Sequence, residues 1–309
     1  MALWQLDEVW QSGLQATTHR FGQLCLELRC VRPAVLLQVC NGGHKTRNGV
    51  NDSDPTGMQA WGLARTLSAF VVERQAAFEG VSVLEFGCGQ GMVGIVAAHF
   101  AAQVVLTDYE TSVLALASLN AAAAAESSLK QLQRPAPAVR RLVWTSNAGD
   151  PTDLGTTAEA TGAGLGRFDV LLGSELLYHE TDIDALLKTM ERHLSPNGVS
   201  IMAFHVRLYG LVADLKAAAL SENMALVFAD IDSVAPSDLG AREARGTMGG
   251  NFFCILARDA ERETALKPWL SGLTRVEVDD VHAGTETETA ASGADPDDED
   301  EGIFGLFAE

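Results

Sequence analysis

The stretch VLEFGCGQG, residues 83–91, constrains the fold more than any other part of this chain. A run of strand character beginning at Val83 leads directly into glycines at positions 87, 89 and 91. Glycine allows positive φ angles and a close approach of the backbone to a ligand. With Gly94 the spacing also fits GxGxxG, the dinucleotide fingerprint, so the glycines alone do not identify the ligand.

Strand and helix patterns alternate along most of the chain. Apolar periodicity predicts strands at 81–87, 102–108, 139–144, 168–175, 199–206, 225–231 and 251–258. The same criterion predicts helices at 57–75, 92–100, 111–132, 181–194 and 211–222. This alternation indicates a largely parallel sheet with helices on both faces. The ligand is then expected beyond the carboxyl ends of the strands.

Local signals add detail to this pattern. Thr181 or Asp182 is expected to cap the helix that follows. The tetrapeptide SPNG at 195–198 predicts a turn, and residues 147–167 read as a flexible loop.

Composition divides the chain into three parts. Residues 1–56 form an N-terminal extension with strand-like segments and a mobile loop, and residues 57–270 form the α/β domain. Residues 271–309 form an acidic tail, predicted to be disordered, that ends in an apolar FGLF segment. Twelve acidic residues and no Lys or Arg lie between Val276 and Glu309, which leaves 29 acidic against 22 basic residues elsewhere. Without a basic surface, direct nucleic-acid binding is not expected.

The cysteines and the N-terminus indicate the compartment. Five cysteines without CxxC spacing suggest a reducing environment, and no metal site is visible. The first residues lack the basic and apolar segments of a signal peptide, and no stretch approaches about 18 uninterrupted apolar residues. We expect a cytoplasmic monomer without membrane partners, with the nucleus as the alternative location.

Two acidic residues accompany the glycine turn. Glu85 precedes it, and a carboxylate there suits a ligand with a positive amino group better than a pyrophosphate, because like charges repel. This favours S-adenosyl-L-methionine. Asp108 follows the next strand, where an acid can accept hydrogen bonds from both ribose hydroxyls. The alternatives are a glycine turn without a ligand and a solvated loop acid.

Aromatic and polar residues follow the next two strands. Trp144 would give an adenine pocket a flat apolar wall, although a plain core role is also open. The sequence Gly173-Ser174-Glu175 then ends a hydrophobic strand, and Tyr178 follows. One helical turn would place Glu175 and Tyr178 on a common face, where they could hold an amine nucleophile. Glu175 could instead cap the next segment.

Together these segments resemble the family-16 seven-β-strand protein lysine methyltransferases. The resemblance covers roughly residues 20–260 and rests on GMQAWGLART, VLEFGCGQGMVGI, VVLTDYE, LVWTSN and FDVLLGSELLYHE in this order. It implies a Rossmann-like α/β fold with the seven-stranded class I methyltransferase sheet and S-adenosyl-L-methionine as cofactor. It implies Glu175 and Tyr178 as catalytic residues. It further implies these cofactor-binding residues: Trp61, Glu85, Gly87, Gly89, Gly91, Asp108, Trp144 and Ser174.

The substrate motif departs from the Asp-x-x-Tyr of that family, because it reads Glu175-Leu-Leu-Tyr178. The version with Glu is also similar to the related protein histidine methyltransferase, so lysine and histidine both stay open as targets. A small-molecule methyltransferase would have a closed pocket instead of an open rim. A non-catalytic interaction module would bind no cofactor.

The C-terminal sequence DPDDEDEGIFGLFAE is similar to the C-terminal peptide of the acidic ribosomal stalk proteins, which engages translation factors. In that interpretation the acidic residues steer the encounter, and Phe304 and Phe307 fill an apolar groove. The alternative is that these phenylalanines fold back onto the chain itself. The resemblance implies a protein substrate such as a translation elongation factor or a ribosomal protein.

Overall fold

The computed structural model describes residues 13–32, 55–146, 164–178, 181–206, 210–231, 251–258 and 262–278. Most of the predicted loop at 147–167 and the tail beyond residue 278 lie outside these residues, as does most of the predicted mobile loop before residue 55.

The strands of the described residues are β1 (Leu14–Phe21), β2 (Leu24–Val31), β3 (Ser82–Phe86), β4 (Gln103–Asp108), β5 (Ala138–Arg141), β6 (Phe168–Ser174), β7 (Leu194–His205), β8 (Met224–Asp230), β9 (Asn251–Arg258) and β10 (Arg275–Val276). The helices are η2 (Pro55–Met58), α3 (Gly62–Glu73), α4 (Gln75–Phe78), α5 (Met92–Ala97), α6 (Thr111–Glu126), α7 (Ser128–Gln131), α8 (Ile183–His193), α9 (Leu211–Ser221) and α10 (Arg262–Leu270).

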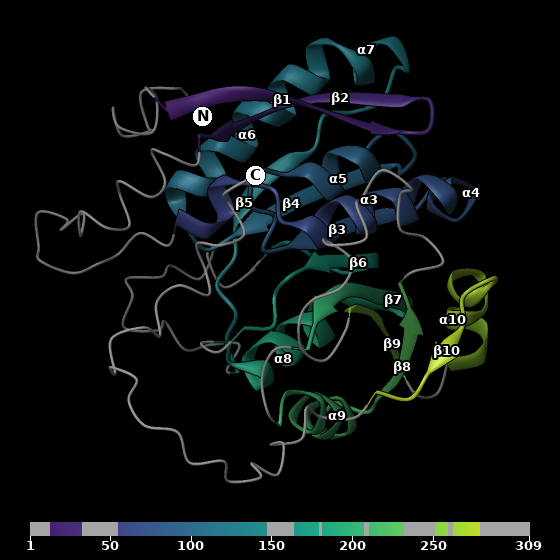
Figure 1. Cartoon of the computed structure of the whole chain (residues 1–309). Coiled ribbons are helices and arrows are strands. Elements are labelled where there is room, and N and C mark those ends of the chain that lie inside the picture. Colours follow the sequence, from purple (N-terminus) through teal and green to yellow (C-terminus); the bar gives the residue numbers. More distant parts are fainter. Residues whose placement is uncertain are drawn as a thin grey trace, which may run out of the picture.

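A mixed sheet forms the centre of the molecule (Figure 1). Its strand order is β10-β8-β9-β7-β6-β3-β4-β5. The five strands from β7 to β5 are parallel, whereas β9 is antiparallel to both of its neighbours. The chain winds from β3 towards β5 and then resumes at β6 on the other side of β3. This confirms the predicted Rossmann-like sheet, and it places the topological switch point between β3 and β6.

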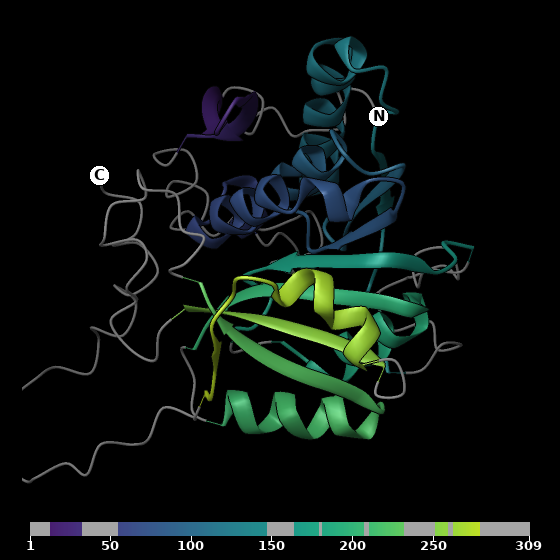
Figure 2. The same ribbon diagram turned by 90° about the vertical axis from the view of Figure 1, so that its right-hand side faces the viewer.

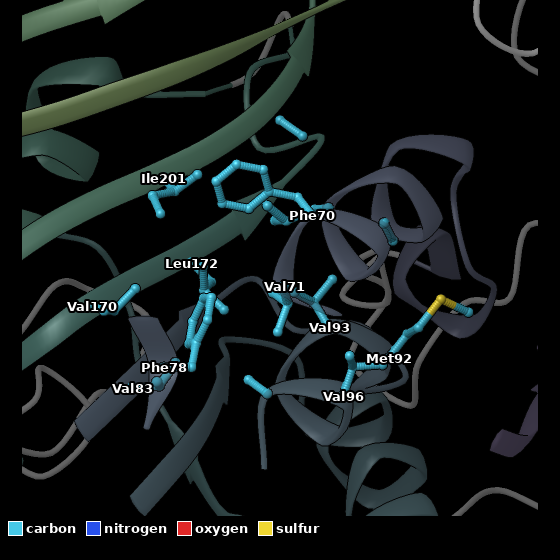
Figure 3. Close-up of a cluster of buried hydrophobic side chains, with 14 of the residues drawn as sticks. Phe70, Val71, Phe78, Val83, Met92, Val93, Val96, Val170, Leu172 and Ile201 are labelled. Atoms are coloured by element: carbon cyan, nitrogen blue, oxygen red, sulfur yellow. The ribbon is translucent and has the colours of Figure 1, made fainter. Parts of the chain in front are cut away.

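Helices cover both faces of this sheet, as the alternating pattern predicted. Apolar side chains of β3 point alternately to the two sides, so that Val83 joins one buried cluster and Leu84 the other. On the Val83 side, α3 packs on β6 and β7, whereas α5 packs on β3 and β4. Figure 3 shows Phe70 of α3 next to Ile201 of β7. On the other side the sheet is covered by α8 and α9.

A two-stranded hairpin precedes the domain. β1 pairs with β2 in antiparallel register, and β2 lies against α6 (Figures 1 and 2). The sequence predicted strand character from residue 24 onward but not β1, because the polar run Thr17, Thr18, His19 and Arg20 hides its pattern. Within β2 the alternation is clear, since Leu26, Leu28 and Cys30 are buried.

The C-terminal end of the domain differs from the prediction. The sheet was expected to have seven strands, with the tail beginning at residue 271. Instead Arg275 and Val276 form β10 on the edge of β8, and the Lys216 ammonium donates a hydrogen bond to the Val278 carbonyl. A strand of two residues carries too little alternation to be recognised in a sequence.

Three local features also differ. The SPNG segment forms no separate turn. It lies within β7 as an irregularity, where the register shifts between the pairs Phe168–Leu194 and Val170–Val199. The alanine-rich helix predicted over 111–132 breaks at Ser127 into α6 and α7. The third strand of the domain ends at Arg141, before Trp144.

The stretch 111–131 has the length and the mean hydropathy, 1.2, of a membrane span. Half of it is buried inside the protein, and Leu114, Ala117 and Ala121 belong to the core on the Val83 side of the sheet. Its apolar character is therefore accounted for by packing.

Candidate active site

A cleft lies at the carboxyl ends of β3, β4 and β6, beside the switch point of the sheet. It contains about 790 Å³ of space not filled by protein atoms, open solvent included. Nine of the ten predicted site residues line it: Trp61, Glu85, Gly87, Gly89, Asp108, Trp144, Ser174, Glu175 and Tyr178. The tenth, Gly91, does not. The structure thus brings together residues that the sequence separates by more than a hundred positions.

The glycine turn forms the floor of the cleft. Gly87 and Gly89 have φ angles of 54° and 53°, which side chains rarely tolerate. A Cβ atom on Gly87 would lie 2.6 Å from the Leu176 side chain. Gly91 precedes α5 at φ 90°, and a Cβ there would press on Leu106. Gly91 therefore shapes the entry into the helix, while the other two glycines present bare backbone to the cleft.

Glu85 lies below the turn and is almost fully buried. Its Oε2 atom accepts a hydrogen bond of 2.8 Å from the Gly94 amide. Burial raises the pKa of the Glu85 carboxyl to about 8; the nearby Asp108 also raises it, and the Gly94 amide acts in the opposite direction. Without a cation nearby, Glu85 is therefore mostly protonated at neutral pH. A positively charged group in the cleft would favour its ionised form.

Asp108 closes β4 and turns towards the glycine turn. Its Oδ2 atom accepts a hydrogen bond from the Gly89 amide at 3.2 Å, and its Oδ1 atom accepts one from the Glu110 amide at 3.1 Å. Both bonds fix the carboxylate at the wall of the cleft. The adjacent Tyr109 and Glu110 line the cleft as well.

Two tryptophans stand at the cleft, from different elements. Trp61 immediately precedes α3. Trp144 packs on Phe86, with ring centroids 6.4 Å apart. The segment after Trp144 is fixed by α8, because the Thr145 amide donates to the Thr189 hydroxyl at 3.0 Å and Arg192 donates to the Thr145 carbonyl at 2.7 Å. Trp144 therefore belongs partly to the core and partly to the cleft.

Glu175 and Tyr178 lie on the loop after β6, but the expected helical turn is absent there. Glu175 adopts the left-handed region, with φ 56°, and its amide donates to the Ala203 carbonyl. Thr181 then fixes the loop. Its hydroxyl donates to the Leu176 carbonyl at 2.7 Å and accepts from the Tyr178 amide at 3.1 Å. The Tyr178 side chain is 37% exposed, so it stands at the open rim.

Of the two residues that the sequence offered as helix cap, Asp182 has this role. Its carboxylate accepts from the Ala185 amide at 2.9 Å.

Sequence reasoning missed one wall of the cleft, formed by Gly57, Gln59 and Ala60 before α3 and by Gln90 in the glycine turn. Gln90 sits between two of the predicted glycines, which was the signal available for it. The segment 57–60 reads as the start of a helix, and Gln59, its one polar side chain, gives no pattern. Among the described residues, no three His, Cys, Asp or Glu side chains gather as a metal site would require.

The residues present fit S-adenosyl-L-methionine. Gly87 and Gly89 line the cleft without a side chain, so a ligand can approach their backbone closely. The buried Glu85 suits a cation, and the face of Trp144 suits a purine ring.

Comparisons with known proteins agree with this chemistry. A family model described as lysine methyltransferase matches residues 49–218, more than half of the chain. The chain is 31% identical over 147 residues to protein N-lysine methyltransferase METTL21A of Mus musculus, which covers 48% of this chain and 60% of that protein. It is 25% identical over 167 residues to the histidine protein methyltransferase 1 homolog of Bos taurus, which covers 50% of this chain and 45% of the relative.

Among solved structures, magnesium protoporphyrin IX methyltransferase from Synechocystis with bound SAM matches with a TM-score of 0.42 at 16% identity. The match covers 64% of this chain and 80% of that one.

Proposed function

Because this chain belongs to the lysine methyltransferase family, we propose that it is an S-adenosylmethionine-dependent protein N-methyltransferase that acts on lysine. One observation carries the proposal: the glycine turn, Asp108 and Trp144 share a single cleft with Glu175 and Tyr178. The first three would hold the cofactor, and the last two would face the substrate.

In this proposal each cofactor-binding residue contacts a different part of the cofactor. Asp108 binds the ribose hydroxyls, Trp144 covers the adenine, and Glu85 faces the charged amino-acid end. When bound, S-adenosyl-L-methionine supplies a methyl group on a sulfonium, ready for transfer to a nucleophile.

Glu175 and Tyr178 would prepare the incoming amine. A lysine must be neutral to react, and losing its proton at pH 7 costs about 4.6 kcal/mol from a reference pKa of about 10.4. Glu175 does not lower this cost, because a nearby anion raises the pKa of an amine. Its role is to bind and orient the amine and to stabilise the ammonium product, while the Tyr178 hydroxyl oxygen accepts a hydrogen bond. Orientation of this kind is worth up to about 7–11 kcal/mol of the barrier.

The open rim supports a protein substrate over a small molecule. Tyr178, at the substrate side, is 37% exposed, and a lysine on a protein surface could reach it. A fully enclosed site would suit a small molecule better.

A histidine target is the second candidate, and one observation favours it. The residue at the substrate motif is Glu175 instead of Asp, and the bovine relative is named for histidine methylation. A histidine is already mostly neutral at pH 7. In this case Glu175 would accept a hydrogen bond from one ring N–H.

The proposed reaction can be tested by adding the protein and labelled S-adenosyl-L-methionine to a lysate. Mass spectrometry then identifies which proteins, and which side chains, carry the label. Label on lysine supports the proposal, and label on histidine selects the alternative. If no methyl group were transferred and calorimetry detected no cofactor binding, both enzyme functions would be contradicted, and the non-catalytic interaction module would be favoured.

We also propose that the protein is a monomer in the cytoplasm. Light scattering tests the oligomeric state, and microscopy of a tagged chain tests the location.

The finer proposal is that the substrate is a translation elongation factor or a ribosome-associated protein. It rests on the tail sequence, whose acidic run and apolar end resemble a ribosomal stalk peptide. A tail that holds the target raises its effective concentration at the cleft. Deleting residues 295–309 should raise KM for the protein substrate and leave methylation of a short target peptide unchanged. An equal loss of methylation on the protein substrate and on the peptide would favour the alternative in which the tail folds back onto the chain itself.

A further inference from the structure

Asn120 links the N-terminal hairpin to the floor of the cleft. It lies in the middle of α6 and is 1% exposed. Its Oδ1 atom accepts from the Arg29 amide of β2 at 2.7 Å, and its Nδ2 atom donates to the Arg29 carbonyl at 3.0 Å. The second hydrogen of Nδ2 goes to the Gln90 carbonyl in the glycine turn at 2.9 Å. One carboxamide thus pairs with the edge of β2 as another strand would and also holds the turn.

Gln90 extends this link to the missed wall of the cleft. With its amide oriented to satisfy both neighbours, its nitrogen donates to the Arg29 carbonyl at 2.9 Å and its oxygen accepts from the Ala60 amide at 3.2 Å. The Arg29 carbonyl therefore accepts hydrogen bonds from the carboxamides of both Asn120 and Gln90. Gln90 in turn connects Arg29 of β2 to the Ala60 amide in the wall. Gln90 is 2% exposed, so water competes little for these bonds.

A second contact joins the hairpin to the same wall. Gln59 donates from Nε2 to the Val31 carbonyl at 2.7 Å. Val31 and Met58 are completely buried in a small apolar cluster together with residues of α6. The wall also touches the floor directly, since a Cβ on Gly89 would lie 3.1 Å from the Gly57 carbonyl oxygen. The hairpin, the wall and the floor are thus connected by both polar and apolar contacts.

We propose that Asn120 is a positioning residue of the cofactor site, through which docking of the β1–β2 hairpin and binding of S-adenosyl-L-methionine are coupled. The inference rests on the proposed function, because it takes the cleft to be the cofactor site. Asn120 itself does not line the cleft, so it acts through Gln90 and Arg29. Because linkage is reciprocal, a hairpin that strengthens cofactor binding must itself be held more firmly when the cofactor is bound.

The first test uses the unmodified chain with S-adenosylhomocysteine as probe. Hydrogen exchange of the β2 amides is measured with and without the probe. Coupling predicts that the probe slows exchange in β2, although this strand does not line the cleft. Exchange in β8, at the other side of the sheet, is the internal reference and should change little.

The second test replaces Asn120 by Leu, which is close in size but forms none of the three hydrogen bonds. We expect Kd for the probe to rise about tenfold or more, within the usual range of coupling between sites, and KM for the cofactor to rise with it. At saturating cofactor, kcat should change less than about threefold, because Glu175 and Tyr178 are untouched. The control is Ser127→Ala, which removes a hydroxyl bond to the Ala123 carbonyl on the same helix, away from the cleft.

The outcomes separate the inference from the proposed function. Probe binding without slower β2 exchange would overturn the coupling alone. A fall in kcat for N120L with unchanged KM would also overturn it, since that is the pattern of a general structural defect. If the unmodified chain bound no probe, the proposed function and the coupling would both be wrong.

Discussion

The carboxylate of Glu85 and the amide of Gly94 are joined by a buried hydrogen bond of 2.8 Å. This contact requires glycine at position 94, because a Cβ there would lie 2.6 Å from the Glu85 oxygen and 2.1 Å from Leu106. Gly94 made the sequence fit a dinucleotide fingerprint, yet its place here is explained by close packing of α5 on the sheet. The acid below the turn favours a ligand with a positively charged group, beside which it would ionise, over a pyrophosphate.

The raised pKa of Glu85 gives a first prediction. The pKa of its carboxyl is 4.5 in the reference state and about 8 in the folded protein. Between pH 4.5 and pH 8 the folded state therefore binds a proton that the unfolded state has lost. Stability from this group is full below about pH 4.5 and is lost as the pH rises through 8. The variant Glu85→Gln cannot titrate, so it lacks this dependence of stability on pH. The difference in Tm between variant and parent, in the absence of cofactor, should grow in favour of the variant from pH 5 to pH 8.

The matched control is Glu79→Gln, at an exposed position. It should shift Tm little at either pH. A difference between Glu85→Gln and the parent that stays constant over this range would contradict the buried, protonated state of Glu85.

Asp108 carries the second prediction. Asp108→Ala should weaken binding of S-adenosyl-L-methionine by about 1–3 kcal/mol, because a charged hydrogen-bond partner is lost. Calorimetry measures this change in the binding free energy of the cofactor. Asp169→Ala is the control, since this exposed carboxylate pairs with Ser82 at the opposite end of the strands. Equal affinities for Asp108→Ala and the parent would remove Asp108 from the proposed ribose site.

The sequence predicted the main elements of the fold because their patterns are strong and local. β3, β4 and β6 are apolar runs; Gly87 follows β3, Asp108 ends β4 and Ser174 ends β6. These signals indicate both the strands and the edge where the cleft forms. For the same reason the residues at those ends could be named. β10 and the hairpin strand β1 were missed because pairing with a neighbour, not their own pattern, makes them strands.

The details of the cleft were less accessible from sequence. The left-handed Glu175 replaces a helical turn. The loop after it is held at Leu176 and Tyr178 by Thr181, a residue that the sequence offered only as a helix cap. The wall formed by Gln59 and Gln90 depends on contacts with β2, some thirty to sixty positions away. Such contacts between distant segments leave no periodic trace in a sequence.

Thr189 carries the third prediction, because it fixes the segment that holds Trp144. Thr189→Val leaves the shape nearly unchanged but removes the hydroxyl that accepts from the Thr145 amide and from Arg192. We expect a loss of about 1–3 kcal/mol of stability from the unsatisfied buried groups. Cofactor affinity should fall as well, because Trp144 is no longer held in place.

Ser200→Ala is the control for Thr189→Val, since its buried hydroxyl has a weaker partner, the Met190 sulfur at 3.6 Å, on the same helix. Denaturant unfolding and calorimetry measure the two effects. Should Thr189→Val lose stability but keep full cofactor affinity, Trp144 would be a core residue without a binding role.

The last prediction concerns Glu175 and Tyr178, whose proposed task is chemistry and not cofactor binding. Tyr178→Phe keeps the ring and removes the hydroxyl, so kcat should fall while Kd for the cofactor stays nearly unchanged. Glu175→Gly gives a sharper test because Glu175 has φ 56°, a conformation that costs a non-glycine residue about 1–3 kcal/mol. Glycine adopts it without strain. The variant should therefore lose turnover while keeping the packing of its loop, a combination that a purely structural role for Glu175 does not produce. Unchanged turnover in both variants would move the substrate site away from the loop after β6.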